Sequence, residues 1–171
     1  MYDASIEVVN LKMDDVTRPK IYSAGMHPWF IDEKRWRDEI RGLEMKVHEK
    51  KCLAVGECGL DKLSKVNFEV QVQVFTEHVI VANSVNKPLI VHCVKAYNEL
   101  INVLNQCDNK VPVIIHGFNN NENIARVLLD HGCMFSFGKD LVKFESNASK
   151  VIRNIGRKNF FLETDDSDIS I

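Results

Sequence analysis

Five side chains that could bind a metal or move a proton each follow a short apolar run. His27 follows Tyr-Ser-Ala-Gly-Met, and Glu57 follows Leu-Ala-Val-Gly. His92, His116 and Asp165 stand in the same position after Pro-Leu-Ile-Val, Pro-Val-Ile-Ile and Phe-Phe-Leu-Glu-Thr. A single histidine of this kind is more often a structural residue than a ligand. Two imidazoles and two carboxylates, from Glu57 to Asp165, together form a donor set suited to Zn, Mn, Fe or Mg.

These side chains can meet only if the apolar runs are parallel strands, whose carboxyl ends face one mouth. The runs are short and rich in Val, Ile and Phe, which is typical of strands buried on both faces. Seven such runs occur along the chain: 6–10, 20–25, 52–56, 88–92, 111–116, 133–138 and 159–163.

Amphipathic segments with helical spacing separate the runs. Apolar residues recur at i, i+4, i+7 and i+11, which places them on one helical face. Asn119 and Glu122 resemble a capping box, and Gly132 and Gly156 stand where glycines follow helix ends. The pattern predicts five helices, over 36–47, 68–79, 100–107, 124–128 and 141–155.

The alternation of strands and helices predicts a parallel α/β sheet, because each helix returns the chain for the next parallel strand. A TIM-type (β/α)₈ barrel usually needs about 250 residues. The 171 residues, expected to form a single domain over 1–171, therefore predict an incomplete barrel. An open doubly wound sheet is the alternative, but no strand is followed by G-x-G-x-x-G or G-x-x-x-x-G-K-[ST].

Composition narrows the class of protein further. The 22 basic and 24 acidic residues give a formal charge of −2, which excludes a basic coat for nucleic acid but not a local positive cleft. The sequence has no apolar run near eighteen residues and no signal-peptide pattern, so no membrane contact and a cytoplasmic location are expected. The five cysteines contain no C-x-x-C pair, which favours reduced thiols over disulfides or a thiolate zinc site.

The amino-acid sequence at the strand ends resembles that of the TatD family of metal-dependent deoxyribonucleases. The matching segments, in order, are Met-His-Pro-Trp from residue 26, Ala-Val-Gly-Glu-Cys-Gly-Leu-Asp from 54, Pro-Leu-Ile-Val-His from 88, Ile-His-Gly-Phe from 115 and Leu-Glu-Thr-Asp from 162. The resemblance implies a TIM-type barrel that binds one or two divalent ions (Mg, Mn or Zn). It also implies hydrolysis of phosphodiester bonds in DNA, a substrate that the residue pattern alone does not specify.

The resemblance also assigns roles to individual residues. Glu57 is expected to bridge two metals and, with Asp165, to be catalytic. His92 and His116 are expected to complete one metal site. Asp165 is expected to bind the other metal and to orient the attacking water.

The resemblance makes His27 and Lys95 candidates for contact with the substrate. His27 could instead only shape the turn into Pro28. Lys95 stands one place later than the arginine expected in the family and could be a solvated lysine at a helix start.

Several other residues could have either a functional or a structural role. Trp29 and Phe30 could stack on a nucleobase or pack internally. Asp61 is expected to lock its loop through backbone hydrogen bonds rather than to bind metal. Structural or exposed positions are expected for the remaining histidines, His48, His78 and His131.

The sequence departs from the family pattern at both ends. The family opens with a strand carrying H-x-H, which is absent here, so the run 6–10 corresponds to the second strand. We therefore expect strands two to eight without the first strand and the closing helix, and a truncated form with reduced or no activity. Open sheet edges would favour self-association. The alternatives are a non-catalytic binding or assembly module, and another amidohydrolase-like enzyme acting on a small phosphoester or lactone.

Overall fold

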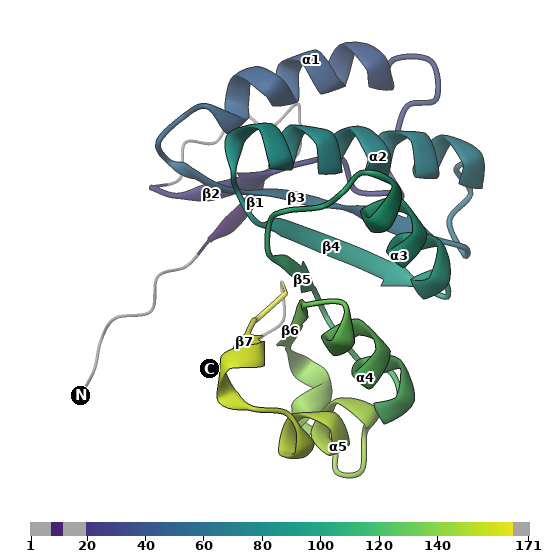
Figure 1. The fold of residues 1–171 in the computed structure, drawn as a ribbon, viewed down its shortest axis with the longest axis vertical. Helices are drawn as coiled ribbons and strands as arrows, with labels where there is room; N and C mark the ends of the chain where they lie inside the picture. Colours follow the sequence, from purple (N-terminus) through teal and green to yellow (C-terminus); the bar gives the residue numbers. More distant parts are fainter. Residues whose placement is uncertain (1–7, 12–19, 166–171) are drawn as a thin grey trace.

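The computed structural model of the chain describes residues 8–11 and 20–165, and within them the strands form one parallel sheet. Each strand pairs with the strand before it in sequence, in the order β1 to β7 (Figure 1). The inner strands bury most of their apolar residues, as predicted, whereas the first and last strands are largely exposed. The strands are β1 (Val9–Leu11), β2 (Tyr22–Ala24), β3 (Cys52–Asp61), β4 (Leu89–Val94), β5 (Val113–Ile115), β6 (Cys133–Phe137) and β7 (Phe160–Leu162).

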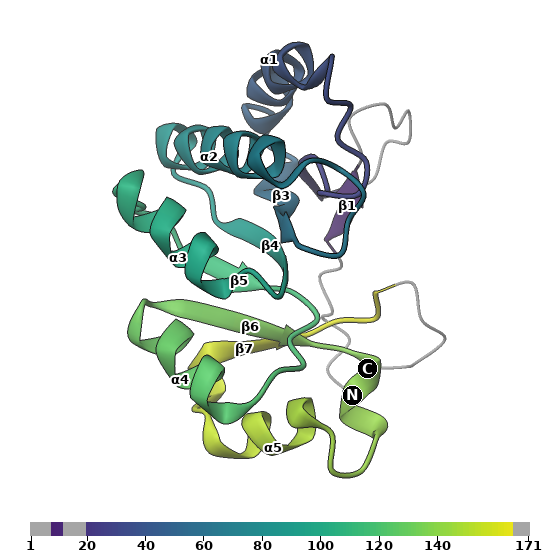
Figure 2. The same ribbon diagram turned by 90° about the vertical axis from the view of Figure 1, so that its right-hand side faces the viewer.

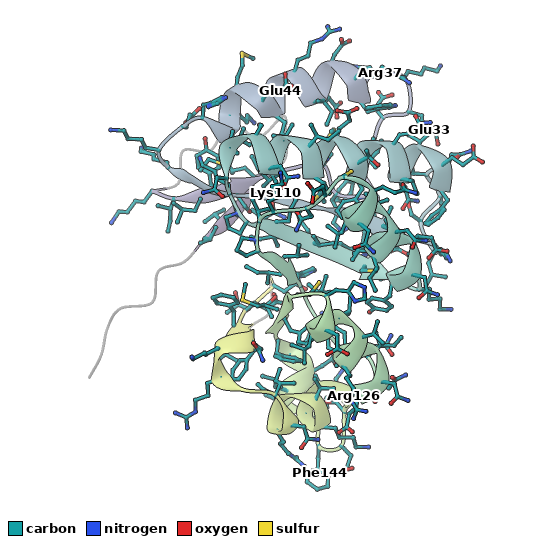
Figure 3. All side chains as sticks on the ribbon, in the orientation of Figure 1. Glu33, Arg37, Glu44, Lys110, Arg126 and Phe144 are labelled. Carbon is teal, nitrogen blue, oxygen red and sulfur yellow. The ribbon has the colours of Figure 1, made fainter. Side chains whose placement is uncertain are left out.

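Helices cover the outer face of this sheet, and the strands curl away from them (Figure 2). The helices are α1 (Trp36–Val47), α2 (Phe68–Val85), α3 (Tyr97–Gln106), α4 (Glu122–Asp130) and α5 (Asn147–Asn154), with 3₁₀ turns η1 (Lys139–Val142) and η2 (Arg157–Asn159). Charged side chains such as Arg37, Glu44 and Arg126 project from the helices (Figure 3). The predicted incomplete TIM-type barrel, with strands two to eight of the parent fold, is confirmed. None of the described helices has the length and apolar character to cross a membrane.

A bulge in β3 sets the position of Glu57. The register with β4 shifts between Val55 and Cys58, so that Gly56 and Glu57 together oppose one residue of β4. Bulges of this kind re-aim a side chain. Gly56 has φ +142°, and a Cβ there would collide with the carbonyl oxygen of Ile90. Glycine before Glu57 therefore lets β3 lie close against β4.

The helix predicted over residues 141–155 is wrong in extent. The segment forms the 3₁₀ turn η1, a short connection and then α5. Glu145 takes a left-handed conformation with φ +64°, which ends any continuous helix. Ser146 then caps α5 by accepting a hydrogen bond from the Ser149 amide. Phe144, which the pattern placed on the buried face, is 86% exposed.

The predicted capping box is also displaced. Asn121, not Asn119, caps α4, and its side chain accepts from the Ile124 amide. Asn119 instead accepts from the Ala148 amide and so joins the loop before α4 to α5. Gly132 follows α4 with φ +75°, as predicted.

Gly156 also follows its helix, but its φ of −69° does not require glycine.

The described part of the sheet has two edges, β1 and β7. Phe161 and Leu162 on β7 are each 49% exposed, and Val9 on β1 is 38% exposed. The predicted strand over 6–10 is present as β1, although residues 6 and 7 lie outside the described part of the chain. Self-association through these edges stays a prediction.

Candidate metal centre

The carboxyl ends of the strands bring six possible ligands together in two groups of three. The first group is His27, Glu57 and His92, and the second is His116, Glu163 and Asp165. Within each group the ligand atoms all lie within 4.8 Å of one another. The parallel topology predicts this convergence, because β2, β3, β4, β5 and β7 all end at the same mouth.

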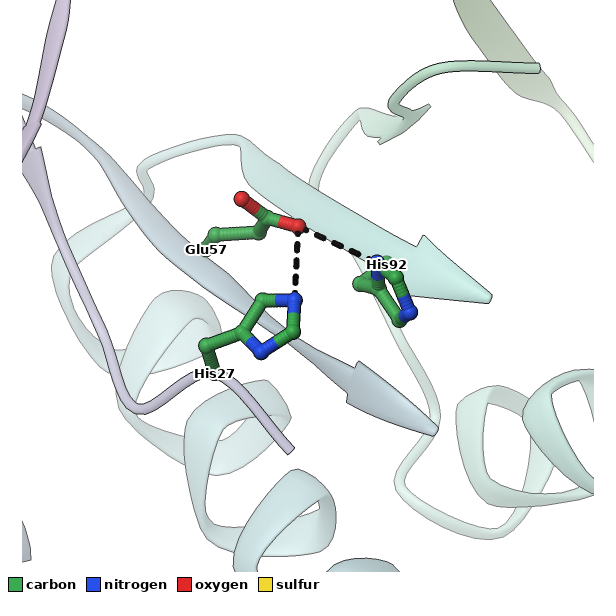
Figure 4. Close-up of side chains that lie close together, drawn as sticks. All are labelled: His27, Glu57 and His92. Carbon is green, nitrogen blue, oxygen red and sulfur yellow. Dashed lines mark ion pairs between the residues drawn. The ribbon is translucent and has the colours of Figure 1, made fainter. Parts of the chain in front are cut away.

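The first group is built around one carboxylate oxygen (Figure 4). Glu57 Oε1 lies 3.3 Å from His27 Nε2 and 3.3 Å from His92 Nδ1. All three side chains are only 12–14% exposed. Two imidazoles and a carboxylate that face one another in this way form a set with nitrogen and oxygen donors.

The second group joins the first through His116. His116 Nε2 lies 3.1 Å from Glu57 Oε1, and its Nδ1 lies 3.2 Å from Glu163 Oε1. Asp165 is exposed and follows β7 with φ +45°. His116 thus stands between the two carboxylates, and Glu57 contacts both groups.

The two glutamates show a common sign of a cation site. Glu57 Oε1 and Glu163 Oε1 are buried, and neither accepts a hydrogen bond from the described residues. A buried carboxylate oxygen without a donor is costly. The imidazole nitrogens lie near Glu57 Oε1 without hydrogen-bond geometry, so the residues fit a divalent ion held among them.

Burial and the neighbouring ionisable groups determine the protonation of Glu57 and His116 in the absence of metal. Burial alone would raise the pKa of Glu57, but the imidazoles of His116, His27 and His92 hold it well below its usual range. Burial alone would lower the pKa of His116, but Glu163 and Glu57 raise it to about 10. A proton on His116 therefore balances the two carboxylates when no metal is present.

Asn10 on β1 fixes the Glu57 carboxylate. Its Nδ2 donates to Glu57 Oε2 over 3.1 Å, and its Oδ1 accepts from the Glu57 amide over 2.7 Å. Ser23 Oγ donates to the same Oδ1 over 3.3 Å. This clamp holds one carboxylate oxygen and leaves Oε1 to face the imidazoles.

Asp61, at the end of β3, holds the far side of the His92 ring. Its Oδ2 lies 3.0 Å from His92 Nε2 and accepts from Trp29 Nε1 over 2.6 Å. Its Oδ1 accepts from the Leu63 amide, which confirms the predicted loop lock. With an ion bound between His92 Nδ1 and Glu57, His92 Nε2–H would donate to Asp61, and Nδ1 would be the nitrogen that binds the ion. A carboxylate behind a metal-binding histidine acts in this way in many metal sites.

His78 supports the first group from the core. The residue is fully buried in α2, its Nε2 accepts from the Met26 amide over 3.0 Å, and its Nδ1 donates to the Val74 carbonyl over 2.8 Å. It therefore fixes the backbone beside His27. His78 is structural, and His48 and His131 are exposed, as predicted.

The structure divides the sequence-predicted site residues among three places. Glu57 and His92 fall in the first group, and His116 and Asp165 in the second. His27, expected to contact substrate, lies among the possible ligands. Lys95 is exposed beyond β4, and none of the described residues forms an ion pair with it.

Sequence reasoning gave no role to Glu163. It stands two residues before Asp165, a spacing that puts both side chains on one face of an extended segment. Ser136 Oγ donates to Glu163 Oε2 and so ties this carboxylate to β6.

A comparison with protein-family models identifies the family. Residues 6–169 match the model described as TatD related DNase. The chain belongs to the TatD family. The resemblance seen in its strand-end motifs is thereby confirmed, and the family is one of metal-dependent hydrolases.

Curated relatives match between about two thirds and nearly all of the chain. A metal-dependent hydrolase of Buchnera aphidicola is 30% identical over 166 residues, which cover 94% of this chain and 61% of the relative. A protein named 3'-5' ssDNA/RNA exonuclease TatD, from Cronobacter turicensis, is 33% identical over 115 residues, which cover 64% of this chain and 42% of the relative. The chain spans about 60% of the length of the first of these relatives.

Solved structures of TatD-type proteins share the fold. The TatD homolog YJJV from Escherichia coli K12 superposes with a TM-score of 0.73 at 23% identity, over 85% of this chain and 57% of that one. A TatD family hydrolase from Entamoeba histolytica gives a TM-score of 0.71 at 20% identity, over 85% of this chain and 50% of that one. These likenesses support the partial barrel.

Proposed function

We propose that the mouth of this partial barrel is the metal site of a nuclease that hydrolyses phosphodiester bonds in single-stranded DNA. One observation carries the proposal: the buried Glu57 Oε1 lies 3.1–3.3 Å from three imidazole nitrogens and accepts no hydrogen bond from the described residues. The family supplies metal-dependent hydrolysis, and the exonuclease name of one relative supplies the substrate class.

In this proposal each group holds one divalent ion (Mg, Mn or Zn). His27, Glu57 and His92 bind the first ion, and His116, Glu163 and Asp165 bind the second. Glu57 contacts both groups and is the residue suited to bridge them. A bound divalent ion lowers the pKa of its water and offsets phosphate charge.

Residues around the site orient the candidate ligands and supply a proton acceptor. Asn10 and Asp61 orient Glu57 and His92, so the ligands need little rearrangement. Asp165 is exposed at the rim of the mouth, where its carboxylate can accept a proton from an attacking water. Lys95 remains a candidate contact for phosphate.

The test uses the whole chain. The purified protein is stripped with EDTA, reconstituted with Mn²⁺, Mg²⁺ or Zn²⁺, and its metal is counted by mass spectrometry. Degradation of a 5'-labelled single-stranded oligodeoxynucleotide is then followed on a gel. The proposal expects about one or two ions per chain and cleavage that depends on them.

Two other outcomes would overturn the proposal. Metal near zero per chain after reconstitution would favour a non-catalytic binding module. Bound metal with hydrolysis of a lactone or a small phosphoester, but not of the oligonucleotide, would favour another amidohydrolase-like activity.

A further inference from the structure

Two large aromatic side chains lie open to solvent beside the first metal group. Trp29 is 56% exposed and Phe30 is 59% exposed, and only Pro28 separates them from His27 in the sequence. The sequence left packing and stacking open as alternatives for these rings. Exposure above one half excludes packing of these side chains in the core, and their place beside the first metal group distinguishes them from the other exposed apolar side chains.

The Trp29 ring is held in place although most of it is exposed. Its Nε1 donates to Asp61 Oδ2 over 2.6 Å, and Asp61 itself is only 1% exposed. The hydrogen bond fixes one edge of the indole and leaves its apolar surface open. A ring fixed before binding loses little conformational entropy when a ligand stacks on it.

The Trp29, Phe30 and His27 rings lie close together at steep angles to one another. The Trp29 and Phe30 ring centroids are 6.5 Å apart with planes 73° apart. The His27 ring lies 5.0 Å from Trp29 and 5.5 Å from Phe30. His27 also faces Glu57, and the Trp29 ring centroid lies 5.8 Å from that of His92, so the aromatic rings directly adjoin the first metal group.

We propose that the Trp29 ring is a stacking platform for the nucleobase next to the cleaved phosphodiester, with the Phe30 ring, 73° away in orientation, contacting the edge of that base. The proposal rests on the proposed nuclease function. A planar base fits an open ring face, and stacking on aromatic residues is the usual means of holding bases without reading their sequence. Bases inside a duplex already stack on their neighbours, so the platform selects unpaired ends.

The test measures binding without cleavage. Fluorescence anisotropy in EDTA compares two labelled probes of equal length and charge, a single-stranded oligothymidylate and an oligomer of abasic deoxyribose phosphates. Trp29→Ala is expected to weaken oligothymidylate binding about 5- to 100-fold and to leave abasic binding within about twofold. Phe30→Ala is expected to have a smaller effect in the same direction.

Two variants control for loss of fold. Trp29→Phe loses the bond to Asp61 but retains an aromatic face, and is expected to keep most of the preference for bases. Phe144→Ala removes another exposed aromatic ring, beyond β6 at the far end of the sheet (Figure 3), and is expected to leave both affinities unchanged.

Three results would overturn the platform. They are equal loss of affinity for both probes in Trp29→Ala, no preference of the unaltered protein for oligothymidylate, and an oligomer that Trp29→Ala dissociates. The last result would mean that a second copy of the chain covers the rings. Failure of metal-dependent cleavage, with the base preference intact, would count against the nuclease and not against the platform.

Discussion

The two candidate metal groups differ in how firmly their ligands are held. In the first, Asn10 clamps Glu57 and Asp61 braces His92. In the second, Ser136 holds Glu163, while Asp165 is exposed after the last strand. The comparison indicates that neighbouring side chains organise the first group, whereas under the proposed function the second group would need its metal ion to fix Asp165. Preorganised ligands give the higher affinity, so the first group should fill first.

Removal of the shared carboxylate should have the largest effect. Glu57→Gln removes the charge that lies 3.3 Å from His92 and 3.1 Å from His116, so both groups should lose more than about 100-fold in affinity for Mn²⁺ or Zn²⁺. Isothermal titration calorimetry measures the metal affinities of both groups. Glu44→Gln, an exposed position on α1 (Figure 3), is the matched control. Retention of one tight site would show that the groups do not share Glu57.

The core beneath the first group should respond to pH. Burial lowers the pKa of His78 from 6.5 to about 4. Between these values the unfolded chain binds the proton more readily, so the free energy of unfolding should fall as pH falls, by up to about 3 kcal/mol. Urea denaturation of the metal-free protein at pH 7.5, 5.5 and 4.5 measures the change.

Variants of two histidines identify the source of this pH dependence. His78→Gln keeps an acceptor for the Met26 amide but cannot titrate, so the pH dependence should become weaker. His131→Gln, at an exposed position, should leave it unchanged. An unchanged slope in His78→Gln would show that other groups cause the loss of stability.

Substitution of Asp61, which lies behind His92, should affect the metal affinity of the first group alone. Asp61→Asn should lower the metal affinity of the first group about 10- to 100-fold and leave the second group unchanged. Asp165→Asn should lower the metal affinity of the second group and leave that of the first group unchanged. Asp38→Asn, on the exposed face of α1, is the control.

Nitrogen NMR of the histidines gives a readout without metal. The Asp61 hydrogen bond predicts the His92 tautomer with the proton on Nε2, and Asp61→Asn should shift this equilibrium toward Nδ1. A tautomer unaffected by the substitution would remove Asp61 as a positioning residue.

Most of the fold could be predicted from the sequence, because strands buried on both faces read as short apolar runs. All seven predicted strands are present, and four of the five helices lie where the spacing placed them. The fifth was overextended, because the left-handed Glu145 and the Ser146 cap interrupt an otherwise regular apolar spacing. The local backbone conformation and the helix cap therefore determine the structure here, and the helical spacing of apolar residues does not.

Four of the six residues of the candidate site could be singled out from the sequence as ligands, but their grouping could not. Glu57, His92, His116 and Asp165 converge because parallel strands end at one mouth. Their division into two groups depends on how the sheet curls, which no sequence spacing records. Glu163 could have been found from its position two residues before Asp165.

The order of strands in the sheet has a consequence for how the site is made. Each strand pairs with its predecessor, so the sheet can grow in the order in which the ribosome releases the chain. The ligands of the first group all lie within residues 27–92, whereas those of the second lie within 116–165. The candidate ligands of the first group are therefore synthesised before any ligand of the second, so the first group can assemble while the rest of the sheet is still being made.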